Sequence, residues 1–191
     1  MSKRRISALL IALVMSLGVS PAWAETFSVE AVKAAFLYRF ASYVEWPADS
    51  PVTPFVIAVA GAEDVAKQLD QLLPRMKVHG QRVEVRRVAR VAELDGVHIL
   101  YVGRQLTARS RSLRAAAIER PILIVTDDPR GLDAGGIINF IEANRNVRFE
   151  ISLIAADRSR LKIDSALLSV AARVERRPQG AISPVNQEIP R

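Results

Sequence analysis

Cysteine is absent from the 191 residues of this chain, and histidine occurs only twice, at His79 and His98. Without cysteine there is no disulfide framework and no thiol nucleophile, so packing alone must stabilise the fold. Neither histidine has a neighbouring ligand at a metal-binding spacing, and the apolar strand around His98 favours a hydrogen-bonded core residue. No G-x-S-x-G elbow of an α/β-hydrolase occurs either. We therefore expect no metal site, no cofactor site and no enzymatic activity.

Long apolar runs are also lacking, apart from Ile6–Val19 near the start of the chain. Basic residues at positions 3–5 precede this run, and the small-residue pattern at positions 22–24 follows it. This arrangement is typical of an export signal, and the run is too short to span a bilayer comfortably. We predict a signal peptide at residues 1–24, removed by cleavage after Ala24, and a periplasmic location. With no cysteine at the cleavage point, lipid anchoring there is excluded.

The formal charge is +7, and loss of the three basic residues at positions 3–5 lowers it to +4. Arginines remain dense in Arg82–Arg90, Arg104–Arg114 and Arg173–Arg177. In a cytosolic protein such clusters would suggest nucleic acid, but export argues against that partner. Two interpretations remain, namely solvated helix faces and a surface for an acidic partner or a membrane.

Apolar runs that alternate with helical patterns predict a single α/β domain at residues 25–175. We expect a mixed, mostly parallel sheet of about six strands, with helices on both faces and a β-hairpin in the C-terminal half. Residues 176–191 lack periodicity, which predicts a disordered tail. The expected strands are 55–60, 82–88, 97–102 and one beginning at 121–125, with two more in the hairpin of 135–153. The expected helices are 28–44, 63–73, 107–118 and 165–174, with one helical turn at 91–94.

The first expected helix carries aromatic residues with polar tips near its end: Tyr38, Tyr43 and, just beyond, Trp46. They could form a binding surface or could be half-buried packing residues, which is the commoner case. The inward stripe of this helix is expected to hold Val29, Val32, Phe36, Phe40 and Tyr43.

The stretch Gly135–Leu153 predicts a hairpin with a tight turn at Asn144–Asn146. On its second strand, alternation places Val147, Phe149, Ile151 and Leu153 on one face and Arg148, Glu150 and Ser152 on the other. We expect Glu142, on the first strand, to lie opposite Arg148 and Glu150. If another protein covered this face, the charged residues would form a specific polar contact.

One carboxylate pair, Asp127-Asp128, follows the strand that begins at Pro121, at the edge where open α/β sheets often bind ligands. Two adjacent carboxylates could bind a cation or act as acid and base, but aspartate before proline is more often a turn former. A phosphate loop at Gly61–Asp64 is disfavoured because two carboxylates already occupy the helix start.

Several blocks of the chain resemble the YfiR-like family of exported proteins. They are KAAFLYRF (33–40), VEWP (44–47), GGIINF (135–140), residues 144–151, LKI (161–163), Ser165 and Leu167-Leu168. In order and spacing these blocks cover nearly the whole expected domain.

The resemblance implies a non-enzymatic periplasmic repressor with a mixed α/β sheet flanked by helices. Such a protein binds the periplasmic sensor domain of an inner-membrane diguanylate cyclase and so holds down cyclic di-GMP synthesis and biofilm formation. An outer-membrane lipoprotein can sequester it, and it can form a homodimer. The alternative is a periplasmic small-ligand-binding protein or an accessory protein of an outer-membrane uptake system.

The chain departs from the family pattern because it lacks the disulfides that the family repressor uses in folding and redox sensing. Ser152, Ile154 and Asp164 also stand where asparagine, a polar residue and serine are expected. Thiol-based redox control is therefore excluded, whereas partner binding is not. The candidate partner-binding residues are Tyr38, Tyr43, Trp46, Arg145, Arg148, Glu150 and Arg173.

Overall fold

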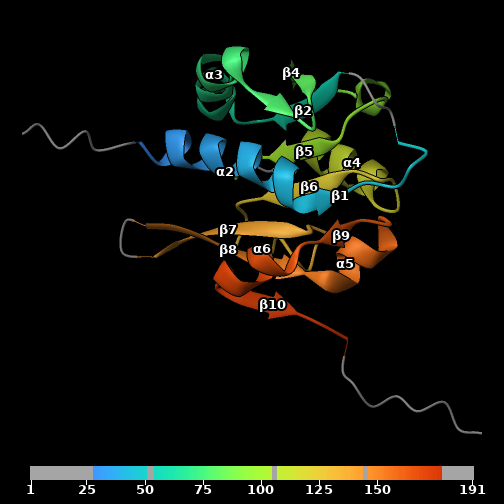
Figure 1. The fold of residues 1–191 in the computed structure, drawn as a ribbon. Coiled ribbons are helices and arrows are strands. Elements are labelled where there is room, and N and C mark those ends of the chain that lie inside the picture. Colours follow the sequence, from blue (N-terminus) through green and yellow to red (C-terminus); the bar gives the residue numbers. More distant parts are fainter. Residues whose placement is uncertain (1–27, 51–53, 105–106, 144–145, 178–191) are drawn as a thin grey trace, which may run out of the picture.

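The computed structural model describes residues 28–50, 54–104, 107–143 and 146–177. Its centre is an eight-stranded sheet with the strand order β10-β8-β7-β6-β5-β2-β4-β3 (Figure 1). The strands of this sheet are β2 (Phe55–Ala60), β3 (Lys77–Val78), β4 (Gln81–Arg87), β5 (Ile99–Val102), β6 (Leu123–Thr126), β7 (Ile138–Ala143), β8 (Asn146–Ser152) and β10 (Arg173–Glu175). A second, antiparallel sheet consists of β1 (Val44–Glu45) and β9 (Lys162–Ile163).

The large sheet is mixed and mostly parallel, as the sequence predicts. Strands β4, β2, β5, β6 and β7 run parallel, β8 returns antiparallel to β7, and β10 lies parallel to β8. It has eight strands rather than about six, because the short strands β3 and β10 add one pairing at each edge. Such short segments carry too little periodicity to be recognised locally.

Helices cover both faces of the sheet, which also confirms the prediction. On one face α2 and α3 pack against the odd-numbered residues of β2 and β5, such as Ile57 and Tyr101. On the other face α4 and the 3-10 turn η2 pack against even-numbered residues such as Ala58 and Leu100. In Figure 1, α2 lies across the front of the sheet. The helices are α2 (Val29–Tyr43), α3 (Glu63–Leu72), η1 (Leu73–Arg75), η2 (Val91–Leu94), α4 (Ala108–Ala117), α5 (Leu153–Arg158) and α6 (Ser165–Val170).

Local sequence signals explain many of these boundaries. The Ser28 hydroxyl accepts a hydrogen bond from the Ala31 N–H, and that of Thr107 accepts one from the Ser110 N–H, so both helices begin at capping residues. His98 is 3% exposed, and its Nδ1 accepts a hydrogen bond from the Val56 N–H at 3.1 Å. The expected role of His98 as a hydrogen-bonded core residue is therefore confirmed.

The C-terminal third differs from the prediction in two places. The helix expected at 165–174 ends at Val170, because Arg173–Glu175 forms strand β10 and pairs with β8 instead. Leu153, expected on the inward face of the hairpin, instead begins α5, which Ser152 caps by accepting from the Ala155 N–H. At Leu153, the capping serine overrides the strand alternation that the sequence predicts. At Arg173–Glu175, pairing with the edge of β8 overrides the predicted helix.

The buried stripe of α2 is also shifted from the expected one. Val29, Val32, Phe36 and Tyr43 are only half-buried, and Phe40 alone of the five expected residues is fully buried. The deeply buried residues are Lys33, Ala34, Leu37, Phe40 and Ala41. The prediction was wrong because an apolar-only pattern omits a lysine and small alanines from the inward face.

Glu93 gives the fold a local dependence on pH. Its carboxylate accepts hydrogen bonds from the backbone N–H groups of Ala89 (2.8 Å) and Arg90 (3.1 Å) and pairs with the Arg90 guanidinium. These contacts, that from Ala89 first, lower the pKa of Glu93 to about 2. Its stabilisation of η2 should therefore be present above the ordinary carboxyl pKa of about 4.3 and disappear as the pH falls through about 2. An NMR titration of the Glu93 carboxyl should show this low midpoint, and a midpoint near 4 would contradict the contact.

Candidate functional site

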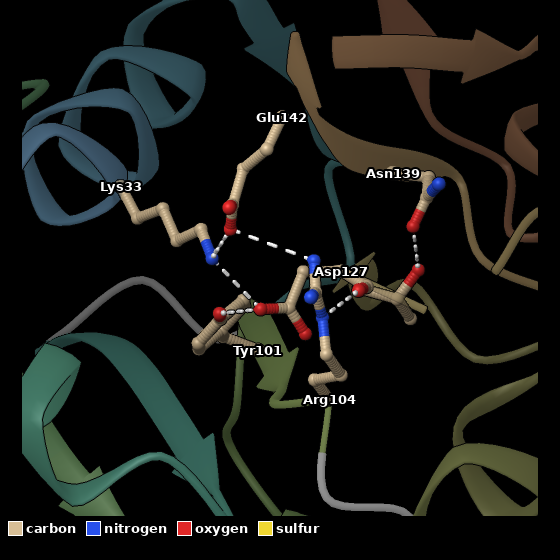
Figure 2. Close-up of polar contacts among 7 residues, drawn as sticks. Lys33, Tyr101, Arg104, Asp127, Asn139 and Glu142 are labelled. Carbon is tan, nitrogen blue, oxygen red and sulfur yellow. Dashed lines mark hydrogen bonds and ion pairs between the residues drawn. The ribbon is translucent and has the colours of Figure 1, made fainter. Parts of the chain in front are cut away.

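A buried lysine links α2 to the carboxyl ends of the central strands. Lys33 Nζ lies 2.9 Å from Oδ2 of Asp127, the first residue after β6, and both side chains are 7% exposed. The same ammonium lies 3.2 Å from Oε1 of Glu142 on β7, whose side chain is 41% exposed. One ammonium therefore bridges two strands from the helix that covers them (Figure 2).

Two further side chains complete this group, which we name the Lys33 cluster: Lys33, Tyr101, Arg104, Asp127 and Glu142. The Tyr101 hydroxyl donates to Asp127 Oδ2 at 3.0 Å. Arg104 Nε donates to the Asp127 carbonyl oxygen at 3.4 Å and its Nη2 to Glu142 at 3.5 Å. Figure 2 shows the five side chains converging from α2 and from the ends of β5, β6 and β7.

Burial, followed by the charge and hydrogen bond of Asp127, raises the pKa of Tyr101 well above its usual value. The hydroxyl therefore stays protonated and acts only as a donor to the carboxylate. Asp127 Oδ1 is buried without a hydrogen-bond partner, so the carboxylate is satisfied on one oxygen only. The cluster is a charge-balanced anchor for α2, and Lys33 occupies the position between two carboxylates that a cation would otherwise take.

A pocket of about 530 Å³ opens beside the Lys33 cluster, beyond the carboxyl ends of β2 and β5. The chain passes from β2 to β4 on one side and then to β5 on the other, so this is the point where the strand order reverses. Open α/β sheets commonly bind ligands at such a point. The loops here are closely packed, since a Cβ on Gly103 would lie 2.6 Å from the Gly61 carbonyl oxygen.

The chemistry of this pocket does not favour a phosphate or a metal. Glu63 and Asp64 occupy the first turn of α3, as expected, and Arg87 pairs with Glu63 and with Asp70. Within residues 28–177, excluding the short undescribed gaps, no group of histidine, aspartate or glutamate side chains is arranged to hold a metal ion. The lining charges are instead largely paired with one another.

Asp127 and Asp128 do not form a catalytic pair. Asp127 faces Lys33 on the α2 side, whereas Asp128 Oδ2 lies 3.7 Å from Arg114 Nη1 on α4, which covers the opposite face. Asp128 Oδ1 also accepts from the Arg130 N–H, which is the turn role expected for it. Because the two carboxylates diverge, they cannot share a cation or exchange a proton through one substrate.

The loop between β6 and β7 requires glycine for close packing. The Thr126 hydroxyl donates to Asn139 Oδ1 at 2.8 Å, and a Cβ on Gly131 would lie within 2.3 Å of both oxygens. Gly135 has φ +90°, a backbone conformation that glycine adopts without the strain a Cβ would cause. Gly131 and Gly135 thus let the loop that follows Asp127 pack closely against Thr126, Asn139 and Ile118.

The predicted aromatic candidates lie mainly in packing positions. Tyr38, Tyr43 and Trp46 are half-buried against the α2-side core. The Tyr38 hydroxyl donates to the Lys77 carbonyl oxygen, and Trp46 packs edge-on against Phe55 at 5.2 Å. These three aromatic side chains thus pack against the core, and their role in partner binding stays a prediction.

The charged candidates of the hairpin share a face of the sheet, except for Arg145, which lies outside the described residues. Arg148 is exposed, and Glu150 on the same face accepts two hydrogen bonds from Arg173 on β10, at 3.2 and 2.9 Å. This contact with Glu150 raises the pKa of Arg173. Glu142 does not lie opposite them as expected: it pairs with Val147 in the ladder and points to the α2 side.

Sequence reasoning missed Lys33, Tyr101 and Glu142 as members of one cluster. A usable signal existed, because Lys33 is spaced from Leu37 and Phe40 by four and seven residues and so shares their helix face. Glu142 likewise alternates with Ile138 and Phe140 on the inward face of β7.

In a comparison with known protein families, the profile of a family described as YfiR/HmsC-like matches residues 30–172. This range includes every member of the Lys33 cluster and both strands of the hairpin, β7 and β8. A comparison with curated protein sequences finds no match.

Proposed function

The chain belongs to the YfiR/HmsC-like family, and on that premise we propose that it is a periplasmic regulatory protein that represses an inner-membrane diguanylate cyclase. It would bind the periplasmic sensor domain of the cyclase and hold down cyclic di-GMP synthesis and biofilm formation. The family match over residues 30–172 carries this proposal. An outer-membrane lipoprotein that sequesters the repressor, and a homodimer, are part of the same proposal.

Other features agree with a binding role. The predicted export signal at residues 1–24 is consistent with a periplasmic partner. The most buried charged groups, Lys33 and Asp127, are engaged with each other and anchor α2. Their arrangement suits a rigid scaffold that presents surfaces to a partner.

We place the partner contact on the outward face of β8 and β10. Arg148 is exposed there and forms no ion pair with another described residue, while Glu150 and Arg173 form a two-point pair beside it. On the opposite face of β8, the rings of Phe36 and Phe40 on α2 pack against Phe149. An exposed arginine next to a fixed ion pair suits an acidic protein surface, since arginine can bind a carboxylate through two hydrogen bonds.

The test is binding of the mature chain to the periplasmic domain of the cyclase encoded beside its gene, measured by isothermal titration calorimetry. We expect a complex at micromolar concentrations. Arg148→Glu should weaken it at least about tenfold, which corresponds to about 1.4 kcal/mol, because an attractive charge becomes repulsive. Arg109→Glu, at an arginine that is also exposed but lies on α4, is the matched control and should leave the affinity unchanged.

Two outcomes would count against different parts of the proposal. Absence of a complex at micromolar concentrations with the wild-type chain would contradict the regulatory function itself. A complex that Arg148→Glu and Arg109→Glu weaken equally would contradict only the assignment of the contact to β8 and β10.

A further inference from the structure

Strand β4 has an open outer side at one end of the large sheet. On its inner side, residues 83–87 pair with β2. On its outer side, within the part of the chain that the structure describes, only β3 pairs with it, at Gln81 and Arg82. In Figure 1, β4 lies at the opposite end of the sheet from β10. The outer edge of residues 83–87 is therefore available to another strand.

The hydrogen-bond pattern shows which backbone groups face this open edge. The Val88 N–H donates to the Val59 carbonyl oxygen of β2, and Val59 pairs with Arg87 in the parallel ladder. Backbone groups alternate in direction along a strand, so those of Val83, Val85 and Arg87 point away from β2. Among the described residues, none of these three forms a backbone hydrogen bond on that side.

The side chains along this edge carry charges in a self-complementary order. Glu84 and Arg86 share one face of the strand, and their side chains are 46% and 32% exposed. Val85, between them, is half-buried against the core on the other face. An edge with charge of one sign would repel a second copy, whereas this edge has opposite charges at equal distances from Val85.

A two-fold axis through Val85 would bring opposite charges together. Such an axis generates an antiparallel pair in which Glu84 lies opposite Arg86 of the second copy, and Arg86 opposite its Glu84. The outward backbone groups of Val85 then bond to those of the same residue in the second copy. Moving the axis by one residue, to Glu84 or to Arg86, would place like charges opposite each other. The charge order therefore selects one register.

From these observations we propose that the outer edge of β4 is the interface of a homodimer, in which β4 of a second copy continues the sheet. This assignment rests on the homodimer of the proposed function and gives it a surface. Five residues from each chain make a small interface, so we expect a weak dimer, with a dissociation constant of about 100 µM or lower. Because β10 lies at the other end of each sheet, the dimer presents two outward faces of β8 and β10, one at each outer end.

Sedimentation velocity of the mature chain between about 10 and 500 µM tests the interface. Glu84→Arg should weaken association at least about tenfold, because two arginines then lie opposite each other, and Arg86→Glu should do the same with two glutamates. Mixed in equal amounts, the two variants should dimerise again, since one chain then offers only arginines and the other only glutamates. Asp157→Arg, at an exposed carboxylate of α5 beside β10, is the matched control and should leave association unchanged.

Val85→Pro provides a test that does not depend on charge. The Val85 N–H points away from β2, so proline removes no hydrogen bond between β4 and β2 but blocks pairing with a second copy. This variant should associate at least about tenfold more weakly than the wild type while its circular dichroism spectrum stays unchanged.

Three results would overturn the proposal: a wild-type chain that stays monomeric up to about 500 µM, a dimer that neither charge reversal weakens, or a mixture of the two variants that stays monomeric. The assay contains no cyclase domain, so its failure would leave the proposed binding of the cyclase untouched. Absence of a cyclase complex would likewise leave the dimer interface untouched.

Discussion

Replacing Lys33 by methionine is expected to lower the free energy of unfolding by about 3–5 kcal/mol. The substitution keeps the length of the side chain but removes the ammonium, which leaves Asp127 as a buried carboxylate facing only the Tyr101 hydroxyl. Glu142 loses less, because its side chain is 41% exposed and water can replace the contact. Urea denaturation of the mature protein, followed by circular dichroism, measures the change.

The matched control is Lys67→Met. Lys67 Nζ lies 3.2 Å from Asp64 on the surface of α3, with both side chains more than half exposed, so its loss should change stability by no more than about 0.5 kcal/mol. Combining Lys33→Met with Asp127→Asn should recover part of the loss, since the amide removes the stranded charge and can still accept from Tyr101. Equal effects of Lys33→Met and Lys67→Met would show that the cluster does not anchor α2.

Phe40→Ala is expected to have a comparable effect, about 3–5 kcal/mol. The Phe40 ring is fully buried, and its centroid lies 5.8 Å from that of Phe140 on β7 and 5.1 Å from that of Phe149 on β8. Truncation opens a cavity between α2 and both strands of the hairpin, and the surrounding rings can fill it only in part. Urea denaturation is again the measurement.

Arg39→Ala, at the neighbouring exposed position of the same helix, should stay within about 0.5 kcal/mol of the wild type. Phe40→Leu should lie between the two, because it retains much of the apolar volume. If Phe40→Ala cost less than about 1 kcal/mol, the contact between α2 and the hairpin would not belong to the stabilising core.

The central strands show how far sequence reasoning reaches. Phe55–Ala60 reads as a buried strand because Pro54 and Gly61 bound an uninterrupted apolar run, and all six residues are buried in β2. Helix α4 begins after Thr107, as its capping side chain predicts. These features depend on neighbours a few residues away, so the linear pattern contains the information.

The candidate site was less accessible to such reasoning. Asp127 was recognised as a residue at a strand end, but its partner Lys33 is 94 residues away in the sequence. Charged residues on a helix are normally assigned to its solvent face, and burial of this lysine becomes favourable only with the carboxylates of Asp127, after β6, and of Glu142, on β7.

By itself, the sequence determined the α/β class, the central strands and most helix starts, the family blocks and the absence of any thiol chemistry. The tertiary structure alone decided that Lys33 meets both Asp127 and Glu142, that Arg173–Glu175 forms a strand, and that Asp127 and Asp128 diverge. The physical reason is the range of the forces involved. Periodicity and capping act within one segment, whereas the burial of a charge and the pairing of an edge strand depend on partners that only the folded chain brings near.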